Sequence, residues 1–179
     1  LPCHNSTSPD GIPYIFLNKT AETISAPLCH LFCRSLPTGS VPAFWKKAII
    51  RPIHKKGSKM KPQNYRPISL TCALSKVMEK LIAYRLKEYF SVNHLFSPLQ
   101  YGFLNDRSTT AVLLRTLQNW LSHVDQGGCI DCIYFDFRKA FDSVSLPKLF
   151  FKLTSCGIRG SLFHWIRDFL SGRSQFVRV

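Results

Sequence analysis

Acidic residues are scarce in this 179-residue chain: ten Asp and Glu accompany 24 Lys and Arg, which gives a net charge of +14. A surface with so few carboxylates favours a polyanion as partner, either nucleic acid or an anionic membrane. Long apolar runs are also missing, since no window approaches the roughly 18 residues of a membrane span. The N-terminus has no basic region followed by an apolar one, so no secretory signal is predicted.

Cysteine occurs seven times, an odd number at irregular spacing, which predicts reduced thiols without disulfide partners in an intracellular protein. Zinc is the alternative use for Cys129 with Cys132, and for Cys29-His30 with Cys33. Residues three apart on a strand point to opposite faces, which argues against the first pair. Cys29 and Cys33 share a helical face that also carries an apolar stripe, so zinc is disfavoured there too.

Enough of the chain is hydrophobic, 45%, to build a core. Helical spacing of apolar residues predicts helices over residues 23–36, 73–90, from Ser108 to about 126, from Pro147 to 157 and over 161–170. Pro37-Thr38-Gly39 is expected to stop the first of these, and Ser108 to be the N-cap of the third. The third helix is expected to face a core with its apolar side chains: Leu113, Leu117, Trp120, Leu121 and Val124. Short β-prone runs at 48–53 and 65–70 flank a basic loop, which predicts a hairpin with a positively charged tip. The chain begins with Leu1 rather than Met, and residues 175–179 resemble the start of a strand with nothing after it. Both ends of the chain are therefore expected to be cut.

The central stretch is Cys129–Val144, where an apolar run, residues 130–137, is interrupted by Asp136. The run predicts a strand buried on both faces, and an unpaired carboxylate there costs several kcal/mol or more. Either a divalent cation such as Mg²⁺ or an ion pair with Arg138 would compensate Asp136, and spacing alone leaves both readings open.

Basic residues are concentrated between Val41 and Phe90, where twelve Lys and Arg accompany Glu79 and Glu88. Such a run is often a solvated surface. Because Pro, Gly and polar residues surround the lysines of the predicted hairpin loop, a polyanion site is the favoured interpretation.

Five segments, in this order, carry a resemblance: IIRPIHKKG, NYRPISL, KVMEKLIAYRL, QYGFLNDRST and FDFRKAFDSV. Together they resemble the fingers and first palm segment of reverse transcriptases from non-LTR, LINE-type retrotransposons, with SPDGIP similar to the turn that precedes them. The resemblance implies an α/β (α+β) fold, mostly helical, with a basic β-hairpin and a palm strand. The implied regions are an N-terminal extension (1–40), the fingers (41–107) and a partial palm (108–179).

The resemblance also implies roles for particular residues. Asp136 corresponds to the first catalytic aspartate, which binds two Mg²⁺ ions with help from the main-chain carbonyl of Phe137. Phe141 corresponds to the aromatic residue that selects dNTPs by crowding a ribose 2′-hydroxyl. The implied triphosphate ligands are Lys55 or Lys56 and Arg66, and the implied template-binding residues are Gln100, Gly102 and Phe103. Asp142 is expected to cap the following turn.

One departure limits this interpretation: the chain contains no paired-aspartate motif of the YADD type. A single carboxylate cannot hold two Mg²⁺ ions against their mutual repulsion, so these residues alone are expected to be inactive. The implied partners of the whole enzyme are an RNA template, a DNA primer or target and dNTPs, with no membrane, in the nucleus or a cytoplasmic ribonucleoprotein.

Two other readings stay open from the residues. The first is a non-catalytic nucleic-acid-binding module from a decayed or domesticated element, favoured by the charge and the single carboxylate. The second is a group II intron maturase, which shares a QxGF-like loop and the AFD sequence but matches NYRPISL and PIHKKG less well.

Overall fold

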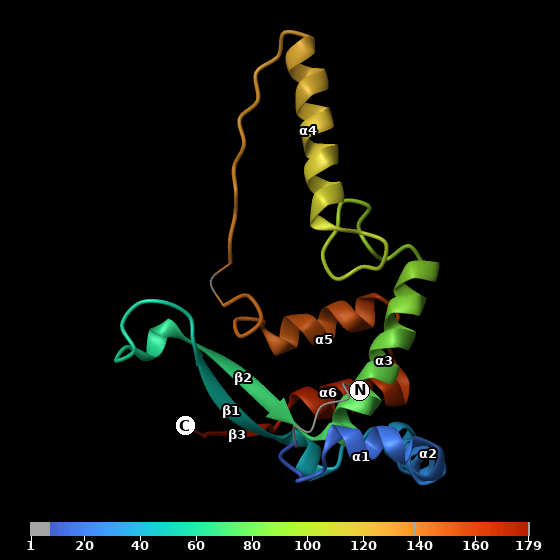
Figure 1. The fold of residues 1–179 in the computed structure, drawn as a ribbon. Coiled ribbons are helices and arrows are strands. Elements are labelled where there is room, and N and C mark those ends of the chain that lie inside the picture. The colour runs from blue at the N-terminus through green and yellow to red at the C-terminus, as the bar shows by residue number, and fades with distance from the viewer. Residues whose placement is uncertain (1–7, 138, 179) are drawn as a thin grey trace. The chain divides into compact units, whose positions relative to one another are not determined.

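The computed structural model describes residues 8–137 and 139–178. Within them, helices are accompanied by a small three-stranded sheet, which confirms the predicted mixture of helix and strand (Figure 1). The elements in chain order are α1 (Tyr14–Lys19), α2 (Ala21–Thr38), the 3₁₀ turn η1 (Ala43–Lys46), β1 (Lys47–His54), the 3₁₀ turn η2 (Pro62–Asn64), β2 (Tyr65–Thr71), α3 (Ala73–Val92), α4 (Thr109–Asp125), α5 (Leu146–Ser155), α6 (Gly160–Leu170) and β3 (Ser174–Val177).

The chain divides into two compact units. The first unit contains the residues up to Leu86 and those from Ser145 onward, and it holds the sheet. The second unit is Lys87–Val144 and holds α4. The long helix α3 begins in the first unit and ends in the second.

The sheet of the first unit has the order β2-β1-β3. Strands β1 and β2 form the predicted hairpin, with Ile53 opposite Arg66 and Arg51 opposite Ile68. Strand β3 lies parallel to β1 on its other side, with Ile49 beside Phe176 (Figure 1). The β-prone sequence at the C-terminus is therefore a strand, as predicted, and it pairs with residues more than 120 positions earlier.

Helices α2 and α6 pack around Trp165, which is 2% exposed. The Trp165 indole donates a hydrogen bond to Ser35 Oγ at 2.9 Å, and Ser35 Oγ donates to the carbonyl of Ser40 at 2.6 Å. Both polar groups are thereby satisfied inside the core, where an unpaired group would cost about 1–3 kcal/mol. The predicted stop of α2 is confirmed, because Gly39 is its left-handed C-cap with φ 63°.

Asp168 on α6 binds the segment that immediately precedes β1. Its carboxylate accepts hydrogen bonds from the Lys46 ammonium at 2.6 Å and from the Val41 main-chain N–H at 2.8 Å. The bond from Lys46 is the largest cause of a lowered Asp168 pKa, and burial opposes it. These contacts join α6 to the segment that leads into the sheet, so the sheet is anchored at this end.

The predicted helices are confirmed, with starts and ends shifted by a few residues. Ser108 is the N-cap of α4, as predicted, and its Oγ accepts the Ala111 N–H at 3.1 Å. The expectation that α4 faces a core is wrong for the part of the chain that the structure describes. Trp120 is half-buried, but the other apolar side chains of that face are about half exposed or more: Leu113, Leu117, Leu121 and Val124.

The predicted buried strand at residues 130–137 is also wrong. Residues 129–137 belong to no helix or strand, and the side chains from Asp131 to Phe137 are exposed (Figure 1). A strand needs a hydrogen-bonded neighbour, and no described strand pairs with this segment. Apolar composition alone therefore does not make this segment a strand, because no described strand forms hydrogen bonds with it.

Across residues 8–137 and 139–178, no helix combines the length and the apolar character that crossing a membrane requires. The six cysteines of these residues are free thiols.

Gly39→Ala should destabilise the α2–α6 contact. An added Cβ would lie 2.7 Å from the Cβ of His164, and φ is +63°. Gly160 is a matched control, because its φ is +62° and its Cβ would meet nothing within 4 Å. Backbone strain costs about 1–2 kcal/mol in either variant, and crowding adds about 1–3 kcal/mol at Gly39 alone. Urea unfolding measures both, and equal losses would contradict the close packing.

Candidate functional site

The β1–β2 hairpin places the predicted triphosphate ligands. Residues opposite each other in an antiparallel pair share a face of the sheet, and side chains alternate along each strand. Arg66 therefore lies on the face that carries Ile53 and, two residues away, Arg51. Lys55 continues the same alternation, and its main-chain N–H donates to the carbonyl of Asn64 at 2.8 Å. Sequence reasoning missed Arg51, which the alternation of β1 could have indicated.

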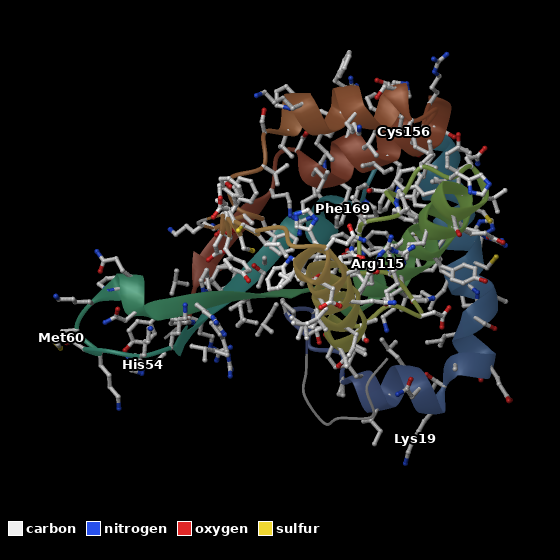
Figure 2. The ribbon with its side chains drawn as sticks, turned by 90° about the horizontal axis from the view of Figure 1, so that it is seen from above. Lys19, His54, Met60, Arg115, Cys156 and Phe169 are labelled. Atoms are coloured by element: carbon white, nitrogen blue, oxygen red, sulfur yellow. The ribbon has the colours of Figure 1, made fainter. Side chains whose placement is uncertain are left out.

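The hairpin tip is ordered by its own side chains. Asn64 Nδ2 donates to the carbonyl of Ser58 at 2.7 Å, and Tyr65 Oη donates to the carbonyl of Lys59 at 2.9 Å. His54 lies 5.3 Å from the Tyr65 ring, edge to face, and its Nε2 is 2.9 Å from the carbonyl oxygen of Gly57. Figure 2 shows His54 and Met60 at this end of the hairpin.

The positively charged side chains of the hairpin are exposed to solvent. Lys55, Lys56 and Arg66 are exposed, and no hydrogen bond or ion pair among the described residues uses their side-chain nitrogens. The carbonyls of Gly57, Ser58 and Lys59 already have partners within the hairpin. The tip therefore offers cations and few free acceptors, which suits an anionic ligand.

In the second unit, Arg107 stabilises the loop that carries the predicted template-binding residues. Its Nη1 donates to the carbonyls of Pro98 at 2.5 Å and Gln100 at 3.0 Å, and its guanidinium lies 5.0 Å from the Tyr101 ring centroid. Gln100 Nε2 in turn donates to the carbonyl of Gly102 at 3.2 Å. Sequence reasoning did not identify Arg107.

The structure brings together two predicted site residues of this unit. The rings of Phe103 and Phe141 meet edge to face, with centroids 6.0 Å apart and an interplanar angle of 84°. Both side chains are 79% exposed, so neither ring belongs to a closed core in the described residues. A pair of open aromatic rings is a surface on which a nucleoside can pack.

Asp136 and Phe137 lie in the exposed segment described above. The alternative ion pair with Arg138 involves a residue outside the described ones.

Asp142, which was expected to cap a turn, is exposed and accepts no hydrogen bond from a described residue. Two Mg²⁺ ions require several oxygen ligands, yet no three His, Cys, Asp or Glu side chains cluster anywhere in residues 8–137 and 139–178. The described residues thus bring no more than two such ligands together at any one place.

The SPDGIP turn has a structural role that the sequence did not reveal. The Asp10 carboxylate accepts hydrogen bonds from Ser8 Oγ, from the main-chain N–H groups of Ile12 and Ala73 at 3.1 and 3.2 Å, and from Cys72 Sγ at 2.8 Å. It thereby binds the N-terminus of α3, immediately after β2. Burial raises the Asp10 pKa, but these hydrogen bonds together lower it below its ordinary value. The same burial raises the pKa of the Cys72 thiol to about 11.

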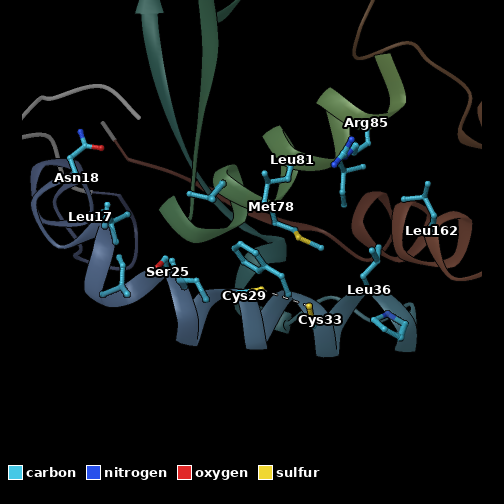
Figure 3. Close-up of a pocket in the computed structure, with 17 residues that line it drawn as sticks. Leu17, Asn18, Ser25, Cys29, Cys33, Leu36, Met78, Leu81, Arg85 and Leu162 are labelled. Carbon is cyan, nitrogen blue, oxygen red and sulfur yellow. Dashed lines mark hydrogen bonds between the residues drawn. The ribbon is translucent and has the colours of Figure 1, made fainter. Parts of the chain in front are cut away.

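An apolar cavity lies apart from these residues. A groove of about 830 Å³ runs between α2 and α3, and Figure 3 shows Cys29, Cys33, Met78 and Leu81 along it. The Sγ atoms of Cys29 and Cys33 lie 3.9 Å apart, so the two thiols do share a helical face. None of the predicted site residues lines the groove.

Residues 53–179 match the family described as reverse transcriptase (RNA-dependent DNA polymerase). The whole chain is 32% identical to a probable RNA-directed DNA polymerase from transposon BS of Drosophila melanogaster, and it covers 20% of that protein. It is 31% identical to the RNA-directed DNA polymerase from mobile element jockey of the same species, over 85% of this chain and 17% of the relative. A 29% identity extends over 95% of the chain to a Pol polyprotein from retrotransposable element R2 of Popillia japonica, of which 23% is covered.

Asp10→Asn should lower the free energy of unfolding by about 1–2 kcal/mol near neutral pH, because an N-terminal acceptor of α3 loses its charge. Since the folded pKa lies below the unfolded value of 3.8, the wild-type contribution is full above that value and disappears as pH falls through the folded pKa. Urea unfolding between pH 7 and pH 2.5 measures this. A difference between the two proteins that stays constant with pH would contradict the role of the charge.

Proposed function

This chain belongs to the reverse transcriptase (RNA-dependent DNA polymerase) family, and from that membership we propose that it forms the fingers and first palm segment of a non-LTR retrotransposon polymerase. The chain spans about a fifth of the length of the curated relatives it matches. The polymerase activity, its RNA template, its DNA primer and its dNTPs are therefore proposed for a longer protein that contains these residues.

The observation that carries the proposal is the face of the hairpin with Arg66 and Lys55. A planar guanidinium presents paired N–H donors to phosphate oxygens, and the neighbouring ammonium adds a point charge. Neither cation has a carboxylate partner among the described residues, so binding a triphosphate would break no existing ion pair. In this proposal Arg66 holds the triphosphate, with Lys55 or Lys56 beside it.

Asp136 is proposed to contribute one carboxylate ligand to a magnesium centre, together with the Phe137 carbonyl. When bound, Mg²⁺ would neutralise charge on the reacting phosphate. Its other ligands would have to come from residues beyond this chain, so nucleotidyl transfer is not assigned to these 179 residues alone. An exposed Asp136 on a segment without strand partners is compatible with a site that is completed elsewhere.

Phe141 is proposed to face the sugar of the incoming nucleotide, and Gln100, Gly102 and Phe103 to contact the template. The edge-to-face contact of Phe103 with Phe141 supports a shared role for the two residues. An apolar ring beside C2′ offers a ribose hydroxyl no hydrogen-bond partner, which disfavours ribonucleotides.

The net charge of +14 and the lack of a paired-aspartate motif in these 179 residues also favour a second candidate, a nucleic-acid-binding module without catalysis. The two functions differ in one measurement. A module binds RNA and never extends a primer, even within the longer protein.

Asp136→Ala in the longer polymerase should reduce primer extension on an RNA template by a factor on the order of 10²–10³ or more, because a charge that acts in the transition state is lost. Asp131→Ala is the matched control, since Asp131 is an exposed carboxylate in the same segment. The control should retain activity. Undiminished extension by Asp136→Ala would remove Asp136 from the mechanism.

Phe141→Ala should shift sugar selectivity. Removing the ring should raise incorporation of ribonucleotides relative to dNTPs by roughly 10–200-fold, which is the range for adding or removing a small contact in a pocket. Single-nucleotide kcat/KM values for dUTP and UTP, which differ only in the 2′-hydroxyl, measure the ratio. An unchanged ratio with normal dUTP incorporation would show that Phe141 does not select the sugar.

A further inference from the structure

Three sulfur-containing side chains line the apolar groove between α2 and α3. Cys29 and Cys33 belong to α2, and Met78 belongs to α3. All three lie in the first of the two compact units. Figure 3 shows them directed toward the space between the two helices. The groove therefore brings two thiols and a thioether to one cavity, and these are the soft metal ligands among protein side chains.

The separation of the two thiols matches the distance between two ligands of one metal ion. The Sγ atoms of Cys29 and Cys33 are 3.9 Å apart. Two sulfur atoms that bind one ion at about 2.3 Å, with an angle of about 110–120° at the ion, are themselves about 3.8–4.0 Å apart. The pair can therefore chelate an ion without a change in the backbone of α2.

The helix that carries the two thiols disfavours a disulfide between them. Positions four residues apart on a helix hold their Cβ atoms about 5–6 Å apart, whereas a disulfide needs about 3.5–4.5 Å. Both positions lie inside α2, well away from its ends. An ion that bridges the two sulfur atoms fits this spacing, and a direct S–S bond does not.

The two thiols also affect each other electrostatically. The hydrogen bond with Cys29 is the largest cause of a raised pKa of the Cys33 thiol, and the charge of an ionised Cys29 adds to it. Two thiolates this close repel each other, and a cation bound between them removes the repulsion. Both side chains are exposed to solvent, so an ion can reach them.

The third ligand indicates which kind of ion fits. Among the described residues no three His, Cys, Asp or Glu side chains form a cluster, so a third ligand for this pair has to be of another type. Met78, which is 3% exposed, supplies a thioether on the α3 side of the groove. Structural Zn²⁺ sites use four thiolate, imidazole or carboxylate ligands, so zinc stays disfavoured here. Thiolate and thioether sulfur together are ligands that Cu(I) prefers.

We propose that Cys29, Cys33 and Met78 form a binding site for a soft monovalent metal ion, Cu(I), which links α2 to α3. When the ion binds, two Cu–S bonds form to thiolates and the two thiol protons pass to solvent, while the thioether donates a lone pair and copper stays in the +1 state. The site shares no residue with the proposed polymerase site, and it does not depend on that function.

The test titrates Cu(I) into the 179-residue chain, anaerobically and with ascorbate, against a colorimetric Cu(I) chelator. Cys129→Ser/Cys132→Ser serves as the parent protein, because those two exposed thiols would otherwise contribute copper binding of their own. The parent should retain one equivalent of Cu(I) and show thiolate-to-copper charge-transfer absorption in the ultraviolet. Adding Cys29→Ser/Cys33→Ser should abolish both signals, and retention of the equivalent would overturn the proposal.

Met78→Leu tests the third ligand. Leucine nearly keeps the volume of methionine but removes the sulfur. The variant should bind Cu(I) roughly 10–100-fold more weakly, the range for losing a supporting contact of a metal ion. X-ray absorption should count two sulfur neighbours at about 2.3 Å instead of three. Met60→Leu is the matched control, because Met60 is 90% exposed on the hairpin, and it should change neither result. An unchanged sulfur count in Met78→Leu would overturn the three-sulfur site.

Thermal unfolding separates a loss of metal from a loss of fold. Cu(I) should raise the midpoint of the parent, because a ligand of the folded state stabilises that state. It should leave the midpoint of the Cys29→Ser/Cys33→Ser variant unchanged, and the metal-free midpoints should agree because both thiols are exposed.

Two further outcomes would overturn the proposal: displacement of Cu(I) by equimolar Zn²⁺, or a metal shell of oxygen and nitrogen neighbours, which would indicate an adventitious ion. The measurements use neither nucleic acid nor dNTPs. Failure of copper binding and failure of primer extension are therefore separate observations.

Discussion

The hydrogen-bonded pairing of β1 with its two neighbours is the constraint on which the functional surface depends. A slip of one residue in a sheet transfers every side chain of a strand to the other face. In the observed register, Ala48 and Ile50 are buried while Arg51 and Arg66 are exposed on the opposite face. Burial of the apolar face therefore selects the register, and the register in turn assembles the cations. Core packing and the placement of the exposed arginines are coupled through this one ladder.

The contacts that hold the sheet come from distant parts of the sequence. Asp10 binds the start of α3 directly after β2, and Asp168 binds the segment that precedes β1. Both carboxylates accept main-chain N–H groups as well as side-chain donors, and both have lowered pKa values. With only ten acidic residues in the chain, two of them are used to fix the ends of a hairpin that carries none. The two carboxylates stabilise the ends of the hairpin from outside it, so the lysines and arginines of the hairpin itself are not neutralised.

Local sequence signals predicted local structure well. The Ser108 cap, the Gly39 stop and the hairpin around its basic loop follow from residues within a few positions of each other. Features that depend on distant partners could not be predicted in this way. The parallel pairing of β3 and the role of Asp10 required three-dimensional contacts, and the apolar run around Asp136 suggested a buried strand that has no partner here. The roles of Asp136, Phe141 and the template loop came from the family resemblance and stay predictions.

The most direct test of the account is the register of the sheet in solution. Backbone nuclear Overhauser effects in the isotope-labelled chain should connect Ile53 with Arg66, Arg51 with Ile68, and Ile49 with Phe176. That pattern would place Arg51 and Arg66 on one face of the sheet. Effects that connect Ile53 with Pro67 or with Tyr65 instead would mean a one-residue slip. Arg66 would then lie on the other face from Arg51, and the cationic surface described here would not exist.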